Sequence, residues 1–513
     1  MSRKALDESP QSDPMMQWLY RHGFTANPFE EWEASKEERL ESYFLPFPFF
    51  DKFYGDPKRP TTAFLFAGRG CGKSAHRLII QARSRPHDPR STVLAIPYTD
   101  DTLFLNDSMV SIPTNLNQHL QTLLKGALGI LLDELTLRPD SWSQLLPDEQ
   151  FELKHLYSAF APNLLHPADL ARRLARQTSK IPLLTLQNAI KQNTFESLVK
   201  EYSLSKSLLF VFWSSFLSTS AGSESMADNL AGFRRFIHLV RSLGIEALYV
   251  LVDGLEEISS SSIQQAKTDF LTSLITATPL LEMPHVAFKF MLPTSVGATI
   301  KQNPEVRADR FKMFDLSWDT GSLEKLLALR LGSFNKRGIN SLKAMADQNG
   351  TGIDEELIRR AHGSPRALVL IGHLLFESHC ANSSTPEVYL KMSELHSAVK
   401  RFNEEYYSLI TTIPLLRVDQ SAGVVAIGGT PLLAKLSKRE FQVLEFLYRT
   451  PGVIRSQQQI IDAIGYDDNV DVAFDSMISR LRAKIEKDPT NPVYLVTERK
   501  RGYRLLNTET LTT

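Results

Sequence analysis

The sequence lacks the features that mark secreted and membrane proteins. It has two cysteines, Cys71 and Cys380, which are too few for a disulfide framework and favour a reducing environment. Apolar runs such as Ser207–Trp213 fall far short of the roughly 20 residues that span a bilayer. The first ten residues contain no apolar segment of the kind found in signal peptides. We therefore expect a cytoplasmic protein with no membrane partner.

An excess of charge of one sign is absent as well. The chain has 58 basic and 58 acidic residues, so contact with nucleic acid would have to come from a local basic patch. No repeat of fixed period is visible, which argues against a solenoid. The histidines show no metal-ligand spacing with the two cysteines, so a zinc-type site is not expected.

The chain has the composition of an ordinary soluble protein, with 42% hydrophobic and 23% charged residues. Its length suggests roughly three or four domains. Short apolar runs alternate with helical patterns, which predicts an α/β fold with a parallel sheet. The strands expected in this sheet are Thr61–Phe66, Thr92–Ile96, Ala247–Val252 and Val286–Leu292.

Changes of pattern along the chain predict four regions. An aromatic-rich segment (1–53) precedes an α/β core (54–320), which contains a helical insertion at about 110–240. A second helical region (321–410) is followed by a compact module (415–507). The insertion is indicated by apolar residues at steps of three and four, namely Leu120, Leu123, Leu124, Ala127 and Leu128.

A glycine-rich stretch that ends in Lys-Ser follows the first expected strand. It consists of Ala67, Gly68, Arg69, Gly70, Cys71, Gly72, Lys73 and Ser74. Phosphate binding needs inward-pointing backbone N–H groups, a lysine charge, a hydroxyl for Mg²⁺ and the positive end of a following helix. A helix is expected over Ser74–Ala82. We therefore predict a P-loop that binds nucleotide through all eight residues, with Ala67 at the position where the strict pattern has glycine.

A second acidic site is expected at the carboxyl end of another strand. Asp253 directly follows Ala247–Val252, at the sheet edge where ligands bind in open α/β folds. We predict that Asp253 holds Mg²⁺ together with Ser74. Glu256 or Glu257 would orient or deprotonate the attacking water. The predicted catalytic residues are Lys73, Asp253, Glu256 and Glu257, and the cofactors are ATP and Mg²⁺.

Aromatic side chains are dense between Met15 and Phe53. One interpretation is that they pack against the core, because aromatic side chains bury large areas. The alternative is that Asn27-Pro28-Phe29 lies near the adenine ring of the nucleotide.

Two short motifs resemble those of known ATPases. Asp253-Gly254-Leu255-Glu256-Glu257 resembles the extended Walker B motif of NACHT-type STAND ATPases. Gly363-Ser364-Pro365-Arg366-Ala367-Leu368 resembles the lid motif of STAND and Orc/Cdc6-like AAA+ ATPases. The resemblance implies that 321–410 form a helical lid, that Pro365 abuts the base and that Arg366 senses the γ-phosphate. Thr294, after the Val286–Leu292 strand, would be the polar sensor.

The same resemblance implies a slow, regulatory ATPase. ADP would hold a closed monomer, and ATP together with an unknown trigger ligand or protein would open it into a homo-oligomer. The arginine that acts in trans is left open, with Arg307 and Arg310 as candidates. A solvated basic face is an equally good explanation of these two residues.

The C-terminal module resembles an OmpR/PhoB-type winged helix-turn-helix. Three stretches carry the resemblance, 436–444, 474–485 and 496–505. An opening hairpin is expected from Val424–Ile427 and Leu432–Leu436, and Ser437 with Glu440 forms the pattern of a capping box. In the expected helix Phe474–Ile485, five apolar residues form one stripe. They are Phe474, Met477, Ile478, Leu481 and Ile485.

The face opposite this stripe is predicted to enter the major groove of DNA, and the wing to enter the minor groove. Between Arg480 and Arg504 eight basic residues stand against three acidic ones, which suits phosphate contact. The predicted DNA-binding residues are Ser476, Ser479, Arg480, Arg482, Thr497, Arg499, Lys500 and Arg501. The serines offer few bidentate base contacts, so sequence readout would be modest.

The sequence favours one function, and two alternatives stand beside it. The first is an ATP-dependent switch that binds DNA through its winged helix and regulates transcription. The second is a STAND-like ATPase of a defence or signalling system whose winged helix mediates protein contacts. The third is a DNA-associated AAA+ loader.

Overall fold

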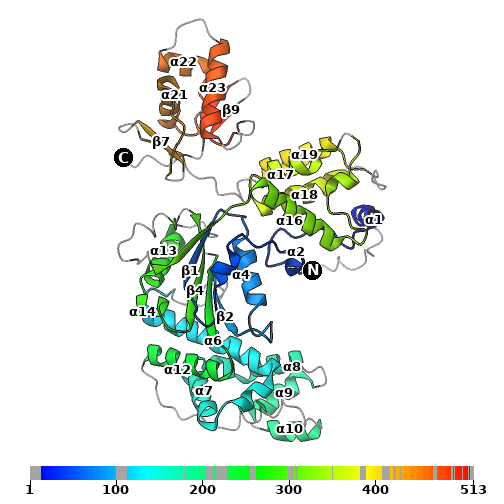
Figure 1. Cartoon of the computed structure of the whole chain (residues 1–513), viewed down its shortest axis with the longest axis vertical. Coiled ribbons are helices and arrows are strands. Elements are labelled where there is room, and N and C mark those ends of the chain that lie inside the picture. Colours follow the sequence, from blue (N-terminus) through cyan, green and yellow to red (C-terminus); the bar gives the residue numbers. More distant parts are fainter. Residues whose placement is uncertain are drawn as a thin grey trace, which may run out of the picture. The chain divides into compact units, whose positions relative to one another are not determined.

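The computed structural model of the chain divides into two compact units, Met1–Glu404 and Glu405–Thr513 (Figure 1). The residues that the structure describes are 13–99, 113–177, 181–192, 194–202, 212–213, 216, 228–254, 261–294, 296–297, 300, 306, 310–348, 350–381, 389–406, 416–419, 423–427, 430–465, 471–486, 489, 492–498, 501–506 and 508.

Unit 1 is built around a five-stranded sheet in the order β2-β3-β4-β1-β5. All its neighbouring strands are parallel, so the predicted α/β fold with a parallel sheet is confirmed. The strands are β1 (Ala63–Ala67), β2 (Val93–Thr99), β3 (Ala247–Asp253), β4 (Val286–Pro293) and β5 (Lys312–Leu316). Because β4 lies between β1 and β3, the carboxyl ends of these three strands meet at one edge of the sheet.

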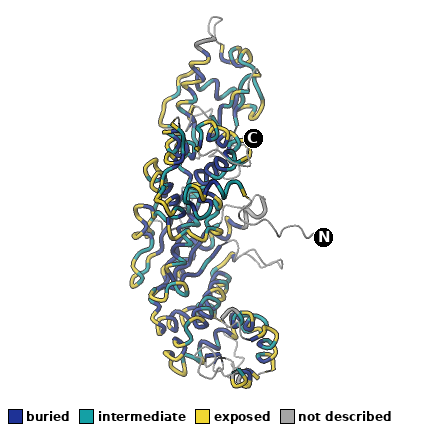
Figure 2. Tube along the Cα trace, turned by 90° about the vertical axis from the view of Figure 1, so that its right-hand side faces the viewer, coloured by how far each residue is buried: buried dark blue, intermediate teal, exposed yellow. Residues whose placement is uncertain are grey.

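The sheet is covered on both faces: β1, β2, β3 and β4 consist almost entirely of buried residues, which are dark blue in Figure 2, and the edge strand β5 is partly exposed. Alternate side chains of each strand enter different clusters, as the two-residue period of a strand requires. Ala63 and Leu65 pack with α3 (Phe50–Tyr54) and α4 (Lys73–Ala82). Phe64 and Phe66 belong to the larger cluster on the other face.

The helices of the larger cluster come mainly from the chain between β2 and β3. They are α6 (Leu116–Leu137), η1 (Pro139–Gln144), α7 (Pro147–Phe160), η2 (Pro162–Leu165), α8 (Pro167–Gln177), α9 (Leu183–Lys191), α10 (Phe195–Glu201) and α12 (Asn229–Ser242). Two further helices, α13 (Ser261–Ile275) and α14 (Thr278–Leu281), follow β3. The side chain of Asn115 caps α6 by accepting from Gln118 N, and the five apolar residues that predicted α6 are fully buried.

A second group of helices follows β5. This α16–α19 bundle consists of α16 (Thr320–Phe334), η4 (Leu342–Met345), α17 (Ile353–Arg360), α18 (Pro365–Cys380) and α19 (Met392–Glu405). The first helix of the chain, α1 (Pro14–Arg21), packs on α18, where the Trp18 and Phe376 rings lie 5.2 Å apart. A short α2 (Leu40–Tyr43) lies in the connection between α1 and the core.

Unit 2 has the order of elements expected for a winged helix. It consists of β6 (Leu416–Asp419), β7 (Val424–Ile427), β8 (Thr430–Pro431), α21 (Lys438–Tyr448), α22 (Gln457–Ile464), α23 (Asp471–Ile485), β9 (Leu495–Glu498) and β10 (Gly502–Leu505). β6–β8 form one antiparallel sheet, and β9 and β10 form a hairpin. Gly502 is required there because an added Cβ would lie 2.0 Å from the carbonyl oxygen of Arg455.

The predicted opening hairpin is wrong in its second strand. β7 pairs with Thr430–Pro431, and Leu432–Leu436 is not a strand. Leu432 N–H still donates to the carbonyl oxygen of Val425 at 2.9 Å. The Leu433 side chain beyond it is fully exposed and has no core to pack against, so burial does not stabilise a longer strand. The predicted capping box of α21 is confirmed, since Ser437 accepts from Glu440 N and Glu440 accepts from Ser437 N.

Within the described part of the chain, no helix combines the length and the apolar character needed to cross a membrane. The described residues also contain no group of three or more His, Cys, Asp or Glu side chains that could hold a metal ion.

Candidate functional sites

The predicted phosphate loop (67–74) runs from the last residue of β1 into the first turn of α4. Gly70 and Gly72 have φ angles of 75° and 91°, which only glycine adopts without strain, and they turn the chain from the strand into the helix. Lys73 is buried, and its Nζ donates to the carbonyl oxygens of Ala67 and Gly68, each at 3.0 Å. The loop therefore encloses the lysine charge at the N-terminal end of α4.

Asp253 is the last residue of β3 and lies at the same sheet edge as the loop. It is 3% exposed. Its Oδ2 accepts a hydrogen bond of 3.0 Å from Arg77 Nε on α4. A carboxylate from Asp253 and a hydroxyl from Ser74 are the oxygen ligands that Mg²⁺ prefers, so the donor set at this edge fits that ion.

Of the residues predicted to be the polar sensor, to act on the attacking water or to act in trans, the structure describes Thr294 and Arg310. Thr294 directly follows β4 and is exposed. Glu256 and Glu257, predicted to act on the attacking water, lie outside the described residues, as does Arg307. Arg310 precedes β5 at the opposite edge of the sheet and forms an ion pair with Glu282.

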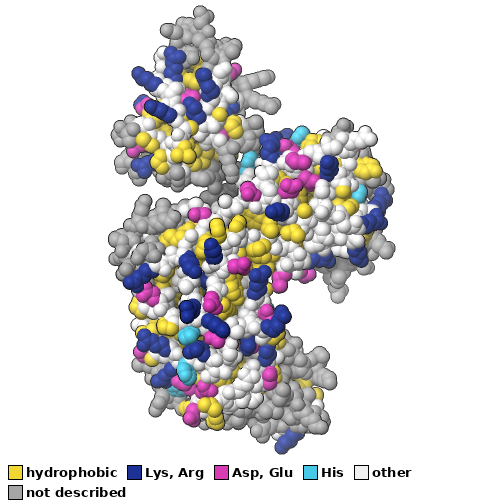
Figure 3. All heavy atoms as spheres, in the orientation of Figure 1, with side chains coloured by type: hydrophobic (Ala, Val, Ile, Leu, Met, Phe, Trp, Pro, Cys, Tyr) yellow, Lys and Arg dark blue, Asp and Glu magenta, His cyan; other side chains and the backbone are white. Residues whose placement is uncertain are grey.

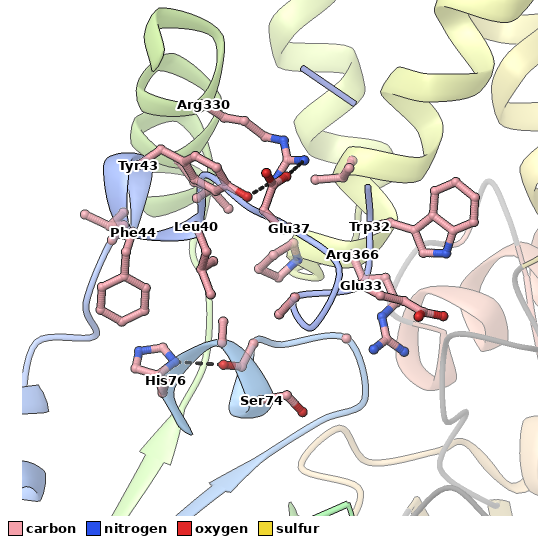
Figure 4. Close-up of a pocket in the computed structure, with 18 of the residues that line it drawn as sticks. Trp32, Glu33, Glu37, Leu40, Tyr43, Phe44, Ser74, His76, Arg330 and Arg366 are labelled. Atoms are coloured by element: carbon pink, nitrogen blue, oxygen red, sulfur yellow. Dashed lines mark hydrogen bonds and ion pairs between the residues drawn. The ribbon is translucent and has the colours of Figure 1, made fainter. Parts of the chain in front are cut away.

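A pocket of about 850 Å³, including its open mouth, lies beside the loop (Figure 4). It is lined by Gly70, Gly72 and the first turn of α4. The α16–α19 bundle adds Leu326, Arg330, Pro365, Arg366 and Val369, and the N-terminal segment adds Trp32, Tyr43 and Phe44, among others. The predicted base-contacting Pro365 and the predicted sensor Arg366 are thus brought next to the P-loop.

The bundle is also hydrogen-bonded to the loop. Arg366 N donates to the carbonyl of Gly70 at 3.2 Å, and Ser364 Oγ donates to the same oxygen at 3.4 Å. Trp318, just before α16, donates from Nε1 to the carbonyl of Cys71 at 2.9 Å. Three donors from the region after β5 therefore fix two consecutive carbonyls of the loop.

The aromatic segment mostly packs, as the first interpretation predicts. Phe29 is fully buried against Phe376, and Asn27, Pro28 and Phe29 do not line the pocket. The segment is anchored by Arg330, which is buried and donates to Glu37 Oε2 at 2.6 Å and to the hydroxyl of Tyr43 (Figure 4). Tyr43, whose pKa is raised well above its usual value by burial, presents its ring to the pocket.

His76 connects the same segment to the loop. It is buried among the rings of Phe44, Phe47 and Phe50. Phe47 N–H donates to Nε2 at 3.4 Å, so the neutral ring carries its proton on Nδ1, 2.8 Å from the carbonyl of Gly72. Burial lowers the pKa of His76 to about 4, against a smaller upward effect of the Gly72 hydrogen bond.

In unit 2 the apolar stripe of α23 is buried, as its spacing predicts. Ser476, Ser479 and Arg480 on the opposite face are exposed. Arg482 differs, because its guanidinium donates to the Leu495 carbonyl at 2.7 and 2.9 Å and to Thr497 Oγ1 at 2.6 Å. Burial lowers the pKa of Arg482, and this side chain joins α23 to the β9 strand.

Fewer of the eight basic side chains between Arg480 and Arg504 are available for phosphate contact than their number suggests. Lys484 pairs with Glu440 at 2.6 Å, and Arg504 pairs with Glu498 at 2.6 Å. Arg501, in the turn between β9 and β10, is exposed. Arg499 and Lys500 lie outside the described residues. On the face of unit 2 that Figure 3 shows, dark blue Lys and Arg side chains lie at the surface among acidic and apolar ones.

Sequence reasoning missed three residues of the candidate nucleotide site, namely Arg77, Trp318 and Arg330. Arg77 carried a usable signal, because it is three residues after Ser74 and helix geometry puts both on one face. Trp318 and Arg330 contact residues 247 and 287 positions away. A local sequence pattern does not predict contacts over such separations.

Known proteins resemble the C-terminal module most clearly. Residues 430–505 match the family described as "Transcriptional regulatory protein, C terminal", in agreement with the predicted winged helix. The sensory transduction protein RegX3 of Mycolicibacterium smegmatis is 41% identical over 92 residues, which are 18% of this chain and 40% of that protein. The chain therefore spans less than half the length of this curated relative.

Two solved structures align with parts of the chain at low TM-scores. The Klebsiella pneumoniae RstA DNA-binding domain, in complex with its RstA box, is 28% identical and covers 19% of this chain and 95% of its own, with a TM-score of 0.17. The Aeropyrum pernix ORC2 protein, in ADPNP-ADP complexes, is 11% identical, and the alignment covers 87% of this chain and 84% of that protein, with a TM-score of 0.32. At these TM-scores the interpretation of unit 1 depends on its own geometry.

Proposed function

We propose that this protein is an ATP-dependent switch that binds DNA through unit 2 and regulates transcription. One observation carries the proposal: a P-loop with an adjoining pocket occurs in the same chain as a module of the transcriptional regulatory C-terminal family. Nucleotide state would control assembly of the protein or exposure of the winged helix.

In this proposal each part of the pocket has one task. The loop amides of Gly70–Ser74 and the end of α4 hold the phosphates, and Lys73 leaves its two carbonyl partners to neutralise them. Mg²⁺, held by Ser74 and Asp253, would stabilise charge on the phosphates during hydrolysis. Trp32, Tyr43 and Pro365 would enclose the base and ribose.

The comparison with NACHT-type STAND ATPases adds finer expectations. Hydrolysis would be slow, with Glu256 or Glu257 orienting the water, Thr294 as polar sensor and Arg366 as γ-phosphate sensor. The hydrogen bonds from Arg366 and Ser364 to the Gly70 carbonyl support the proposal that the α16–α19 bundle moves when the conformation of the loop changes. ATP-dependent self-association would follow release of this closed arrangement, in response to a trigger still to be identified.

DNA binding would use the exposed face of α23 and the wing. Ser476, Ser479 and Arg480 would meet the major groove, while Arg501 with Arg499 and Lys500 would meet the minor groove. Because two of the three α23 residues are serines, phosphate contact would dominate affinity and sequence readout would be modest.

Nucleotide binding and DNA binding are tested separately. Titration with a fluorescent ATP analogue should show binding by the wild type and none by Lys73→Ala, and tight binding by Lys73→Ala would contradict the site assignment. Affinity for random duplex DNA should fall steeply as salt rises. A flat salt response, or no binding at low salt, would favour a winged helix that contacts proteins.

A further inference from the structure

Arg77 is paired with Asp253 inside the candidate nucleotide site, although it lies outside the P-loop motif. Its Nε donates to Oδ2 of Asp253 at 3.0 Å, and the two side chains are 14% and 4% exposed. A buried carboxylate without a counter-ion is strongly unfavourable. Arg77 therefore supplies a counter-ion to the carboxylate that the donor set assigns to Mg²⁺.

The position of Arg77 on α4 places it beside the same ion. Ser74 and Arg77 are three residues apart, so they lie on one face of the helix. That face is turned toward Asp253, because Arg77 reaches it. Gln81, four residues further on, accepts from Nη1 of Arg77 at 3.2 Å and fixes the other end of the guanidinium.

A guanidinium and a divalent cation would compete for this one carboxylate. Mg²⁺ prefers carboxylate oxygens, and two cations a few ångströms apart in a site withdrawn from water repel each other. One negative charge cannot neutralise both.

We propose that Arg77 is a positioning residue that neutralises Asp253 while the site holds no Mg²⁺, and that its guanidinium leaves Oδ2 when a Mg²⁺–nucleotide complex binds. The inference rests on the proposed function, which assigns Ser74 and Asp253 to the metal. Arg77 then sets the Mg²⁺ concentration that the site requires, and the exchange makes α4 respond to the arrival of the metal.

The test uses the full-length protein with Arg77→Met, Arg77→Lys and, as a matched control, Gln81→Ala. Two quantities are measured: the melting temperature in EDTA, and the MgCl₂ concentration that gives half-maximal binding of a fluorescent ATP analogue. Arg77→Met should melt at a lower temperature in EDTA and need about tenfold less MgCl₂, because the competing charge is gone. Arg77→Lys keeps the charge, and Gln81→Ala keeps the Nε–Oδ2 pair, so both should stay near the wild type.

An MgCl₂ requirement of Arg77→Met equal to or above that of the wild type overturns the inference and leaves the proposed function intact. If the wild type binds no nucleotide at any MgCl₂ concentration, the proposed function fails and the inference fails with it. The double variant Arg77→Met/Asp253→Asn removes both charges, so it should regain the stability that Arg77→Met loses. Should Arg77→Met fail to fold, recovery of folding in the double variant supports the pairing, and no recovery overturns it.

Discussion

The indole N–H of Trp318 donates a hydrogen bond of 2.9 Å to the backbone carbonyl of Cys71. Cys71 is part of the P-loop, and Trp318 lies between β5 and α16. Trp318 also lines the pocket beside the loop. The bond therefore links the conformation of the predicted phosphate loop to the start of the α16–α19 bundle, through a residue that lines the candidate nucleotide pocket.

Replacing Trp318 by phenylalanine removes the donor and keeps an aromatic ring. A lost hydrogen bond costs about 0.5–1.5 kcal/mol, so the Kd for a fluorescent ATP analogue should rise about two- to tenfold. Trp142→Phe, the same change in η1 of the helical insertion, is the control and should bind like the wild type. Equal affinities of the two variants would show that nucleotide binding does not depend on this bond.

Arg69 carries an unsatisfied group inside the loop. Its Nε is buried and has no hydrogen-bond partner among the residues that the structure describes, and a buried polar group in this state calls for an explanation. A phosphate oxygen would satisfy it. We expect Arg69→Gln to weaken binding of the ATP analogue about tenfold, the scale of a charged hydrogen bond. Arg90→Gln, which changes an arginine with a 91% exposed side chain, should leave the same titration unaltered.

His76 should make stability depend on pH. Its folded-state pKa of about 4 lies below the unfolded value of about 6.5, so the folded state binds fewer protons between these values. The contribution of neutral His76 to the free energy of unfolding is complete above about pH 6.5. It is lost as the pH falls toward 4, and the loss amounts to at most about 3 kcal/mol. In urea unfolding across this pH range, the free energy of unfolding of His76→Gln should fall less steeply with decreasing pH than that of the wild type.

The exposed His87 provides the control for this measurement. His87→Gln should keep the wild-type dependence of unfolding free energy on pH. His119 is also buried, and burial lowers its pKa to about 4, so some acid sensitivity should remain in His76→Gln. If His76→Gln and His87→Gln gave the same curve, the buried neutral state of His76 would be refuted.

Arg480 and Arg482 should differ in what their loss affects. Arg480 is exposed, so Arg480→Ala should lower DNA affinity, reduce the slope of affinity against salt by about one ion and leave the melting temperature unchanged. Arg482 donates hydrogen bonds to Leu495 and Thr497, so Arg482→Ala should lower the melting temperature of unit 2. Calorimetry combined with DNA anisotropy separates the two effects, and a reversed pattern would contradict the assigned roles.

The sequence predicted β1, β2, β3 and β4 well, because these strands are apolar on both faces. Val286–Leu292 was expected and β4 spans Val286–Pro293, while Thr92–Ile96 was expected and β2 extends to Thr99. β5 was not predicted, since it is an edge strand in which Lys312 and Asp315 are exposed, and its short mixed pattern gives no clear signal.

The chemistry of the site was predictable only where the motif is local. Residues 67–74 form one continuous motif, so their types and order predicted a phosphate loop. The Arg77–Asp253 pair joins positions 176 residues apart and depends on the tertiary arrangement of α4 and β3. In unit 2 the count of basic residues overestimated the free charge, because the carboxylates of Glu440 and Glu498 that pair with Lys484 and Arg504 come from other elements.

The central claim, that nucleotide state controls DNA binding, is tested most directly by anisotropy of a labelled random DNA duplex. Affinity is measured for the wild type and Lys73→Ala with ADP and with a non-hydrolysable ATP analogue at fixed salt. We predict that the wild-type affinities differ by at least about tenfold, within the usual range of coupling free energies, and that Lys73→Ala shows no difference. Equal wild-type affinities in the two nucleotides, under conditions in which both nucleotides are bound, would contradict the account.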